Sequence, residues 1–286
     1  MPHKPTIKLI ECPRDAMQGW KAFIPTEQKI EYLNALLEVG FDTLDFGSFV
    51  SPKAIPQMAD TKEVLAGLNT TGPTKLLAIV ANTRGAEEAV AQAPIRYLGF
   101  PFSISPTFQQ RNTNSSIEES LVRVEEIKNL CDGAGKELVV YLSMGFGNPY
   151  GDDYSEAILL RWADELVQRG IRILSLADTV GLATPEQIRF ALDTLLPKYQ
   201  NVEIGVHLHS TAQNWRDKLE AAVDAGCNRI DGALKGIGGC PMAGDDLVGN
   251  MDTEKMIGYL DSRGLLPVLN REALARSLQL AGRIFQ

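Results

Sequence analysis

The stretch RILSLADTVGLATPEQIRFALDTLLP, residues 172–197, contains a strand pattern followed closely by a helix pattern. Residues 172–178 are mostly apolar, as expected for a parallel β-strand that is covered on both faces. Residues 184–197 carry apolar positions at helical spacing, and Pro185 stands in the first turn, where proline is favoured. The stretch therefore predicts one β-strand followed by one α-helix.

The same unit recurs along the chain. Further strands are predicted at residues 6–12, 43–49, 75–81, 95–101, 137–143, 202–208 and 228–234. Further helices are predicted at residues 26–40, 115–135, 155–170, 253–264 and 271–283. Eight strand–helix units predict an α/β fold of the (β/α)8 TIM-barrel class with a C-terminal helical extension. The composition does not change along the chain, so we expect residues 1–286 to form a single domain.

A doubly wound open sheet is the alternative fold. Such a sheet typically has a glycine-rich phosphate-binding loop after its first strand. Residues 11–20, ECPRDAMQGW, do not have that pattern. The barrel is therefore the favoured prediction.

The composition is that of an ordinary globular protein and argues against two classes of partner. The chain has 44% hydrophobic residues and a formal net charge of -8, and it contains no basic run. We therefore expect no binding to nucleic acid and none to a membrane. There is no apolar signal segment at the start, and four cysteines in a chain of this length suggest reduced thiols. A cytoplasmic location is expected.

Polar residues gather where the predicted strands end, which is where barrel enzymes place their active sites. Arg14, Asp15 and Gln18 follow the first strand, and Asp178 ends the sixth. The seventh strand ends in His207-Leu-His209, although the whole chain has only three histidines. Because residues i and i+2 of a strand point to the same side, the two imidazoles should face one site.

The histidine pair has two interpretations. The rings could be a buried, hydrogen-bonded pair, or they could bind a metal ion. In a closed barrel, strand one neighbours strand eight, and strand eight neighbours strand seven. Asp15 and the loop after the eighth strand would therefore lie close to the two histidines, and Asn250 in that loop could add an amide oxygen. Such ligands suit Mg²⁺ or Mn²⁺, with Zn²⁺ as an alternative. Asn250 could instead cap the helix after it, although Asp252 competes for that role.

The loop GIGGCPMAG, residues 236–244, carries one thiol, Cys240. A thiol close to a dication and to cationic side chains has a lowered pKa and can act as an acid or a base. The alternative is a small apolar filler. The other cysteines, Cys12, Cys131 and Cys227, lie in predicted strands or helices and are expected in the core.

Several segments, taken together and in order, resemble the 3-hydroxy-3-methylglutaryl-CoA lyases, a family of metallolyase barrels. They are IECPRDAMQ (10–18), GSFVSPKAIPQMAD (47–60), NSSIEES (114–120), SLADTVGLATP (175–185), GVHLHST (205–211) and GIGGCPMAGDDLVGN (236–250). The resemblance spans nearly the whole chain and implies cleavage of 3-hydroxy-3-methylglutaryl-CoA to acetoacetate and acetyl-CoA. It also implies stimulation by Mg²⁺ or Mn²⁺, a homodimer and a place in leucine degradation.

The resemblance further implies roles for individual residues. Asp15, His207, His209 and Asn250 would hold the cation, and His207 would also be part of the catalytic group. Arg14 would stabilise enolate charge, Cys240 would transfer a proton, and Asp178 would orient the substrate.

Other residues are expected around the substrate and the coenzyme. Asp45 is a further catalytic candidate, at a position where these lyases usually carry Glu. The candidates for binding coenzyme A are Gln18, Lys21 and Asn112, with Lys53, Arg111 and Lys235 as further cations.

The departures from the family pattern lie around the substrate. Asp45 is one, and Ser210 and Pro106 are two others, so the substrate could be a related 3-hydroxy-3-alkyl acyl-CoA. Two alternatives remain for the function. One is an acyl-CoA condensing enzyme of the citramalate or isopropylmalate synthase type, which usually carries an acidic–basic pair where this loop reads Gly-Gly-Cys-Pro. The other is an inactive barrel that acts as a binding protein.

Overall fold

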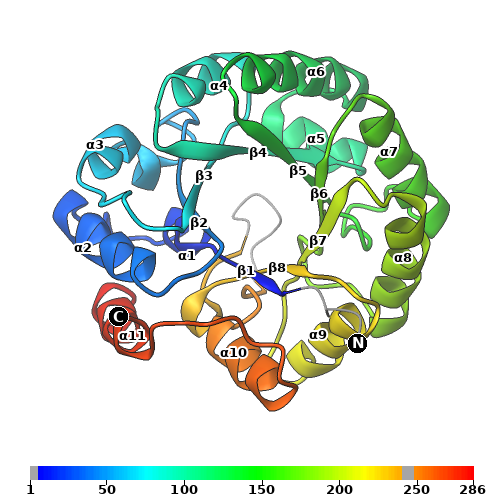
Figure 1. The fold of residues 1–286 in the computed structure, drawn as a ribbon. Helices are drawn as coiled ribbons and strands as arrows, with labels where there is room; N and C mark the ends of the chain where they lie inside the picture. The colour runs from blue at the N-terminus through cyan, green and yellow to red at the C-terminus, as the bar shows by residue number, and fades with distance from the viewer. Residues whose placement is uncertain (1–5, 240–247) are drawn as a thin grey trace.

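Eight parallel strands form a closed barrel in which each strand pairs with its neighbours in the sequence. The computed structural model describes residues 6–239 and 248–286. Figure 1 shows the barrel along its axis with the helices in a ring around it. The strands are β1 (Lys8–Glu11), β2 (Thr43–Ser48), β3 (Lys75–Ile79), β4 (Ile95–Ser103), β5 (Glu137–Ser143), β6 (Ile173–Ala177), β7 (Glu203–His207) and β8 (Arg229–Gly232).

The helices alternate with these strands, so the predicted (β/α)8 barrel is confirmed. They are α1 (Pro13–Gln18), α2 (Thr26–Leu37), α3 (Thr61–Ala66), α4 (Thr83–Val90), α5 (Pro106–Thr113), α6 (Ile117–Gly133), α7 (Glu156–Gln168), α8 (Pro185–Lys198), α9 (Trp215–Asp224), α10 (Thr253–Ser262) and α11 (Arg271–Ile284), with short 3-10 helices η1 (Pro56–Met58) and η2 (Leu234–Gly236). The predicted C-terminal extension is α11, which packs beside α2. There, Phe285 makes edge-to-face ring contacts with Trp20 and Tyr32.

The start of α8 shows why the sequence forms this unit. Thr184 accepts a hydrogen bond from the backbone of Gln187, and the Gln187 side chain accepts one from the backbone of Thr184. This reciprocal pair satisfies two amide groups that a helix start otherwise leaves without partners. Pro185 follows in the first turn, where a missing N–H costs nothing.

Helices α1, α3, α4, α5 and α9 lie outside the predicted helical ranges. Their buried faces explain this, because they carry few large apolar side chains. The buried residues of α4, for example, are Gly85, Ala86 and Ala89. Such small residues pack closely against the barrel but give a weak periodic signal.

The barrel closes where β1 pairs with β8. Ile10 lies opposite Asp231, and Glu11 lies opposite Gly232. The fully buried carboxyl group of Glu11 accepts hydrogen bonds from the backbone N–H of Leu234 at 2.8 Å and from Oγ1 of Thr253 at 2.6 Å. This seam fixes the segment after β8 against the end of β1.

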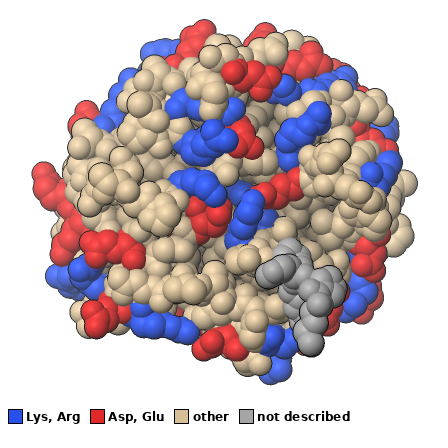
Figure 2. All heavy atoms as spheres, viewed as in Figure 1, with Lys and Arg blue, Asp and Glu red and all other residues tan. Residues whose placement is uncertain are grey.

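Ion pairs join strands where they begin, including β1 and β7, which flank β8 in the barrel. Lys8 pairs with Glu203, and Lys75 pairs with Asp42 at 2.9 Å. Figure 2 shows positive and negative side chains interspersed around the centre of one face of the molecule. Within residues 6–239 and 248–286, no helix has the length and apolar character that a membrane span requires.

Candidate active site

The segment after β1 places two charged side chains at the opening of the barrel. Pro13 begins α1 directly after β1, so Arg14 and Asp15 lie in the first turn of a helix. Both residues are buried, with relative exposures of 8% and 5%. The sequence analysis located these residues at the strand end and did not predict the short helix.

A carboxylate and two imidazoles meet at this end of the barrel. The ligand atoms of Asp15, His207 and His209 all lie within 4.8 Å of one another. The imidazole rings are 5.3 Å apart between centroids. Strand β7 ends at His207, and an isolated bridge between His209 and Asn250 continues the extended backbone. The predicted convergence of these side chains is therefore present.

Asn250 joins this group, while a different residue caps the next helix. Its Nδ2 donates hydrogen bonds to Oδ2 of Asp15 at 2.7 Å and to the carbonyl of Ile237 at 2.9 Å. The cap of α10 is Asp252, whose side chain accepts from two backbone N–H groups. The alternative reading of Asn250 as a helix cap is therefore wrong.

The donor atoms suit a divalent cation. Among the described residues, neither ring nitrogen of His209 makes a hydrogen bond of good geometry, although the backbone of Thr179 lies near the ring, and Oδ1 of Asn250 has no partner. Buried polar atoms in proteins almost always have partners, so these atoms indicate a missing one. A carboxylate, imidazoles and an amide oxygen without a thiolate are typical ligands of Mg²⁺, Mn²⁺ or Zn²⁺.

Arg14 is fixed beside this group by three side chains. Its Nη2 donates to Oδ2 of Asp45 at 2.6 Å, and its Nε donates to the same oxygen at 3.1 Å. Its Nη1 donates to Asp15 and to Gln18, both at 3.0 Å. A planar guanidinium can donate to all these acceptors at once. The single ammonium group of lysine cannot reproduce the two side-by-side hydrogen bonds to Asp45, here called the fork.

The charges of these groups are set by burial and by their neighbours. Burial raises the pKa of Asp15, but Arg14 and the imidazoles more than offset this and bring it to about 2. Burial raises the pKa of Asp45 to about 6 despite the neighbouring Arg14. Burial also lowers the pKa of His209 to about 4. At neutral pH, Asp15 is therefore an anion and His209 is neutral, which are the forms that bind metal ions.

Asp178 and Asp45 lie behind the pocket wall. Oδ2 of Asp178 accepts a hydrogen bond from Nζ of Lys218 at 2.6 Å, and the same ammonium donates to the carbonyl of His209 at 2.8 Å. Neither carboxylate is among the described residues that line the pocket. Each one holds a neighbour: Asp178 acts on His209 through Lys218, and Asp45 acts on Arg14.

A pocket of about 510 Å³ opens over this group. Some of the predicted site residues line it and others do not. The predicted residues in its wall are Arg14, Asp15, Gln18, Arg111, Asn112, His207 and His209. The predicted cations Lys21, Lys53 and Lys235 are not among its described lining residues. Cys240 lies outside the described residues. Cys12, Cys131 and Cys227 are buried free thiols, as predicted.

Sequence reasoning missed two buried charged residues near the site, Lys218 and Asp231. Asp231 interrupts the apolar pattern of β8 and follows Arg229 by two residues, a spacing that puts both on one side of the strand. Two opposite charges at this spacing within an apolar strand were the sequence signal that could have identified Asp231. Lys218 gave no comparable signal, because a lysine on a helix is normally exposed.

The fold and these side chains define a (β/α)8-barrel enzyme with a carboxylate–imidazole site at the C-terminal ends of its strands. The HMGL-like family model matches residues 7–280, and the chain belongs to this family.

Curated relatives and solved structures agree with this assignment. A hydroxymethylglutaryl-CoA lyase of Bacillus subtilis is 33% identical over 273 residues, which cover 96% of this chain and 90% of the relative. The crystal structure of an HMG-CoA lyase from Bacillus subtilis has a TM-score of 0.92 at 30% identity and covers 100% of this chain and 96% of its own. An HMG-CoA lyase structure from Acinetobacter baumannii, in complex with coenzyme A and 3-methylmalate, has a TM-score of 0.91 at 28% identity, with 99% and 92% covered.

Proposed function

We propose that this protein is a carbon–carbon lyase that cleaves 3-hydroxy-3-methylglutaryl-CoA to acetoacetate and acetyl-CoA. One observation carries the proposal: Asp15, His207 and His209 converge beside a fixed Arg14 at the base of a 510 Å³ pocket. Lyase relatives match over nearly the whole chain. Neither a condensing enzyme nor an inactive binding protein is favoured by any feature of the site.

The residues that would hold a divalent cation are Asp15, His207, His209 and Asn250. Among the described residues, the ring nitrogens of His209 and Oδ1 of Asn250 form no hydrogen bond of good geometry, which supports this assignment, with Mg²⁺ or Mn²⁺ as the preferred ions. When bound, such an ion would polarise the tertiary hydroxyl group of the substrate and lower its pKa.

Arg14 has the position and the charge to stabilise the cleavage. In this reaction the hydroxyl group loses its proton and the bond between C2 and C3 breaks. The electron pair of that bond passes to the thioester enolate, which later takes up a proton at C2. The guanidinium of Arg14 would face the enolate oxygen, and such donors typically contribute about 10²–10³ in rate. Asp45 would act as a positioning residue, because its two hydrogen bonds hold the guanidinium plane.

Further residues and properties complete the proposal. Gln18 and Asn112 would contact the acyl-CoA, since both line the pocket. Cys240 would transfer a proton, on the strength of its sequence motif alone. We further propose that residues 1–286 form one metallolyase domain and that the protein is a cytoplasmic homodimer with a place in leucine degradation. Light scattering on the purified protein tests the dimer.

An activity assay on metal-stripped protein tests the proposed reaction. Acetoacetate is measured after 3-hydroxy-3-methylglutaryl-CoA and a panel of 3-hydroxy-3-alkyl acyl-CoA esters are added, with and without Mg²⁺ or Mn²⁺. We expect metal-stimulated release of acetoacetate. The lyase proposal fails if no ester of the panel is cleaved under either condition. Arg189→Ala is a matched control, because this exposed side chain on α8 does not line the pocket and its removal should leave turnover unchanged.

A further inference from the structure

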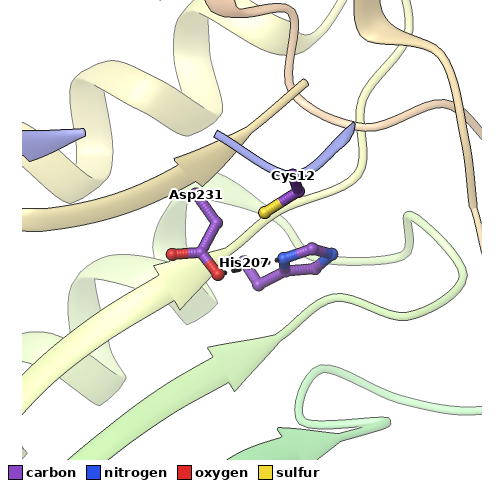
Figure 3. A group of neighbouring side chains, drawn as sticks. All are labelled: Cys12, His207 and Asp231. Carbon is purple, nitrogen blue, oxygen red and sulfur yellow. Dashed lines mark hydrogen bonds and ion pairs between the residues drawn. The ribbon is translucent and has the colours of Figure 1, made fainter. Parts of the chain in front are cut away.

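A second group of potential ligands lies deeper in the barrel and shares His207 with the first. Cys12, His207 and Asp231 have ligand atoms within 4.8 Å of one another. Figure 3 shows the carboxylate of Asp231 beside one ring nitrogen of His207, while the other ring nitrogen lies on the far side of the ring. We call Cys12, His207 and Asp231 the inner group, and Asp15, His207 and His209 the outer group. Because His207 belongs to both, the partners of its two ring nitrogens decide which group can bind a metal ion.

The contact between His207 and Asp231 fixes which nitrogen carries the proton. Nδ1 of His207 lies 3.2 Å from Oδ2 of Asp231. In a hydrogen bond between these two groups, the carboxylate oxygen is the natural acceptor and Nδ1 the donor. A neutral imidazole with its proton on Nδ1 has its lone pair on Nε2. Nε2 is then the nitrogen of His207 that is free to bind a metal ion.

The inner group is poorly suited to hold an ion of its own. The nitrogen of His207 that faces it is already engaged with Asp231. Burial raises the pKa of the Cys12 thiol well above its usual range. Metal ions bind the thiolate form of cysteine, so forming that ligand here would carry a cost.

Arg229 supplies a positive charge near Asp231 inside the barrel. The side chain of Asp231 is fully buried. Arg229 precedes it by two residues on β8, so both side chains point to the same side of the strand. Burial lowers the pKa of Arg229, but the nearby carboxylates, Asp231 first among them, raise it overall. Nη1 of Arg229 also pairs with Oε1 of Glu203 at 3.0 Å.

Gly205 on β7 leaves room for the start of the Arg229 side chain. A Cβ at position 205 would lie 2.8 Å from both Cγ and the backbone carbonyl oxygen of Arg229. A larger residue at position 205 would therefore force β7 and β8 to shift.

We propose that Asp231 is a positioning residue that directs Nε2 of His207 toward the metal ion. The inference rests on the proposed function, because it assigns a metal ion to the outer group. Asp231 keeps the proton on Nδ1, fixes the ring plane and raises the basicity of the coordinating nitrogen. Carboxylates that act in this way behind metal-binding histidines typically contribute 10- to 100-fold to metal affinity.

The first test is the affinity for Mn²⁺, measured by electron paramagnetic resonance on the metal-free protein without substrate. Asp231→Asn should weaken Mn²⁺ binding by about 10- to 100-fold. Cys12→Ala is the matched control, because it alters the same inner group without touching the hydrogen bond, and its affinity should equal that of the wild type. The proposal is overturned if a folded Asp231→Asn variant binds Mn²⁺ as the wild type does. It is also overturned if Cys12→Ala loses binding to the same extent, since the thiol would then be a ligand.

The second test needs no variant. With only three histidines in the chain, the ring nitrogens can be resolved by nuclear magnetic resonance on ¹⁵N-labelled, metal-free wild-type protein. We expect the proton of neutral His207 on Nδ1, and a proton on Nε2 would overturn the proposal.

Failure of the lyase proposal can be distinguished from failure of this one. If the wild type binds Mn²⁺ and depends on Asp231 for it, yet cleaves no acyl-CoA, the positioning role stands and the reaction is wrong.

Discussion

Replacing Glu11 by glutamine should change how the stability of the protein depends on pH. Within residues 6–239 and 248–286, the fully buried carboxyl group of Glu11 forms no ion pair, and burial raises its pKa from 4.5 to about 8. The folded state therefore keeps a proton that the unfolded state releases above about pH 4.5. Because the folded state binds more protons in this range, the free energy of unfolding falls as the pH rises from about 4.5 to 8.

The size of the effect follows from the shift in pKa. Each pKa unit corresponds to about 1.4 kcal/mol, so a shift of three to four units gives an upper limit of about 5 kcal/mol between pH 4.5 and pH 8. Glutamine resembles the protonated acid in shape. Its carbonyl can still accept from the N–H of Leu234, and its amide can donate to Oγ1 of Thr253. Glu11→Gln should therefore lose this part of the pH dependence.

Urea unfolding at several pH values between 5 and 9 measures the prediction. The wild type should lose stability relative to Glu11→Gln as the pH rises, by several kcal/mol across the range. Glu118→Gln is the matched control, since it removes an exposed carboxyl group and should follow the wild-type profile. Parallel profiles for the wild type and Glu11→Gln would refute the reasoning.

Four further predictions follow from the site. Arg14→Lys should lower kcat/KM for 3-hydroxy-3-methylglutaryl-CoA by about 10²–10³, because lysine cannot form the fork with Asp45, and near-normal turnover would contradict this. Lys218→Met should lower the free energy of unfolding in urea by about 3–5 kcal/mol, because Asp178 would be a buried charge without its partner; a loss within error would count against it. Cys240→Ser should reduce turnover and leave Mn²⁺ affinity unchanged, and loss of Mn²⁺ binding would instead make the thiol a ligand. Chelation should abolish turnover, and Mg²⁺ or Mn²⁺ should restore it; activity that survives chelation would argue against a metal-dependent reaction.

The barrel could be predicted from the sequence because its signal is repeated eight times. Each strand is a short apolar run, and helices such as α8 begin with residues that specify a helix start. The ends of the elements were less certain. Strand β1 stops at Glu11, because Pro13 begins a helix at once, and the tight turn between strand and helix leaves no periodic pattern to read.

The convergence of Asp15, His207 and His209 could also be predicted from the sequence. The spacing of His207 and His209, together with strand order in a closed barrel, was enough to bring Asp15 beside them. The role of Asp45 was harder to predict, because a carboxylate at a strand end could face the pocket or a neighbouring side chain. The structure places it against Arg14.

The buried charges required three-dimensional information. Asp231 is recognisable as unusual within an apolar strand, but only the pairing of β7 with β8 brings it opposite His207. Lys218 lies on a helix and reaches Asp178 across 40 positions of the chain. No local pattern encodes a contact over that separation, so such residues emerge only when the elements are packed.

Anomalous diffraction from a crystal soaked in Mn²⁺ tests the central claim most directly. The account predicts one strong peak at the C-terminal end of the barrel, with Asp15, His207, His209 and Asn250 as its protein ligands. An absent peak would contradict the account, and so would a peak between Cys12 and Asp231.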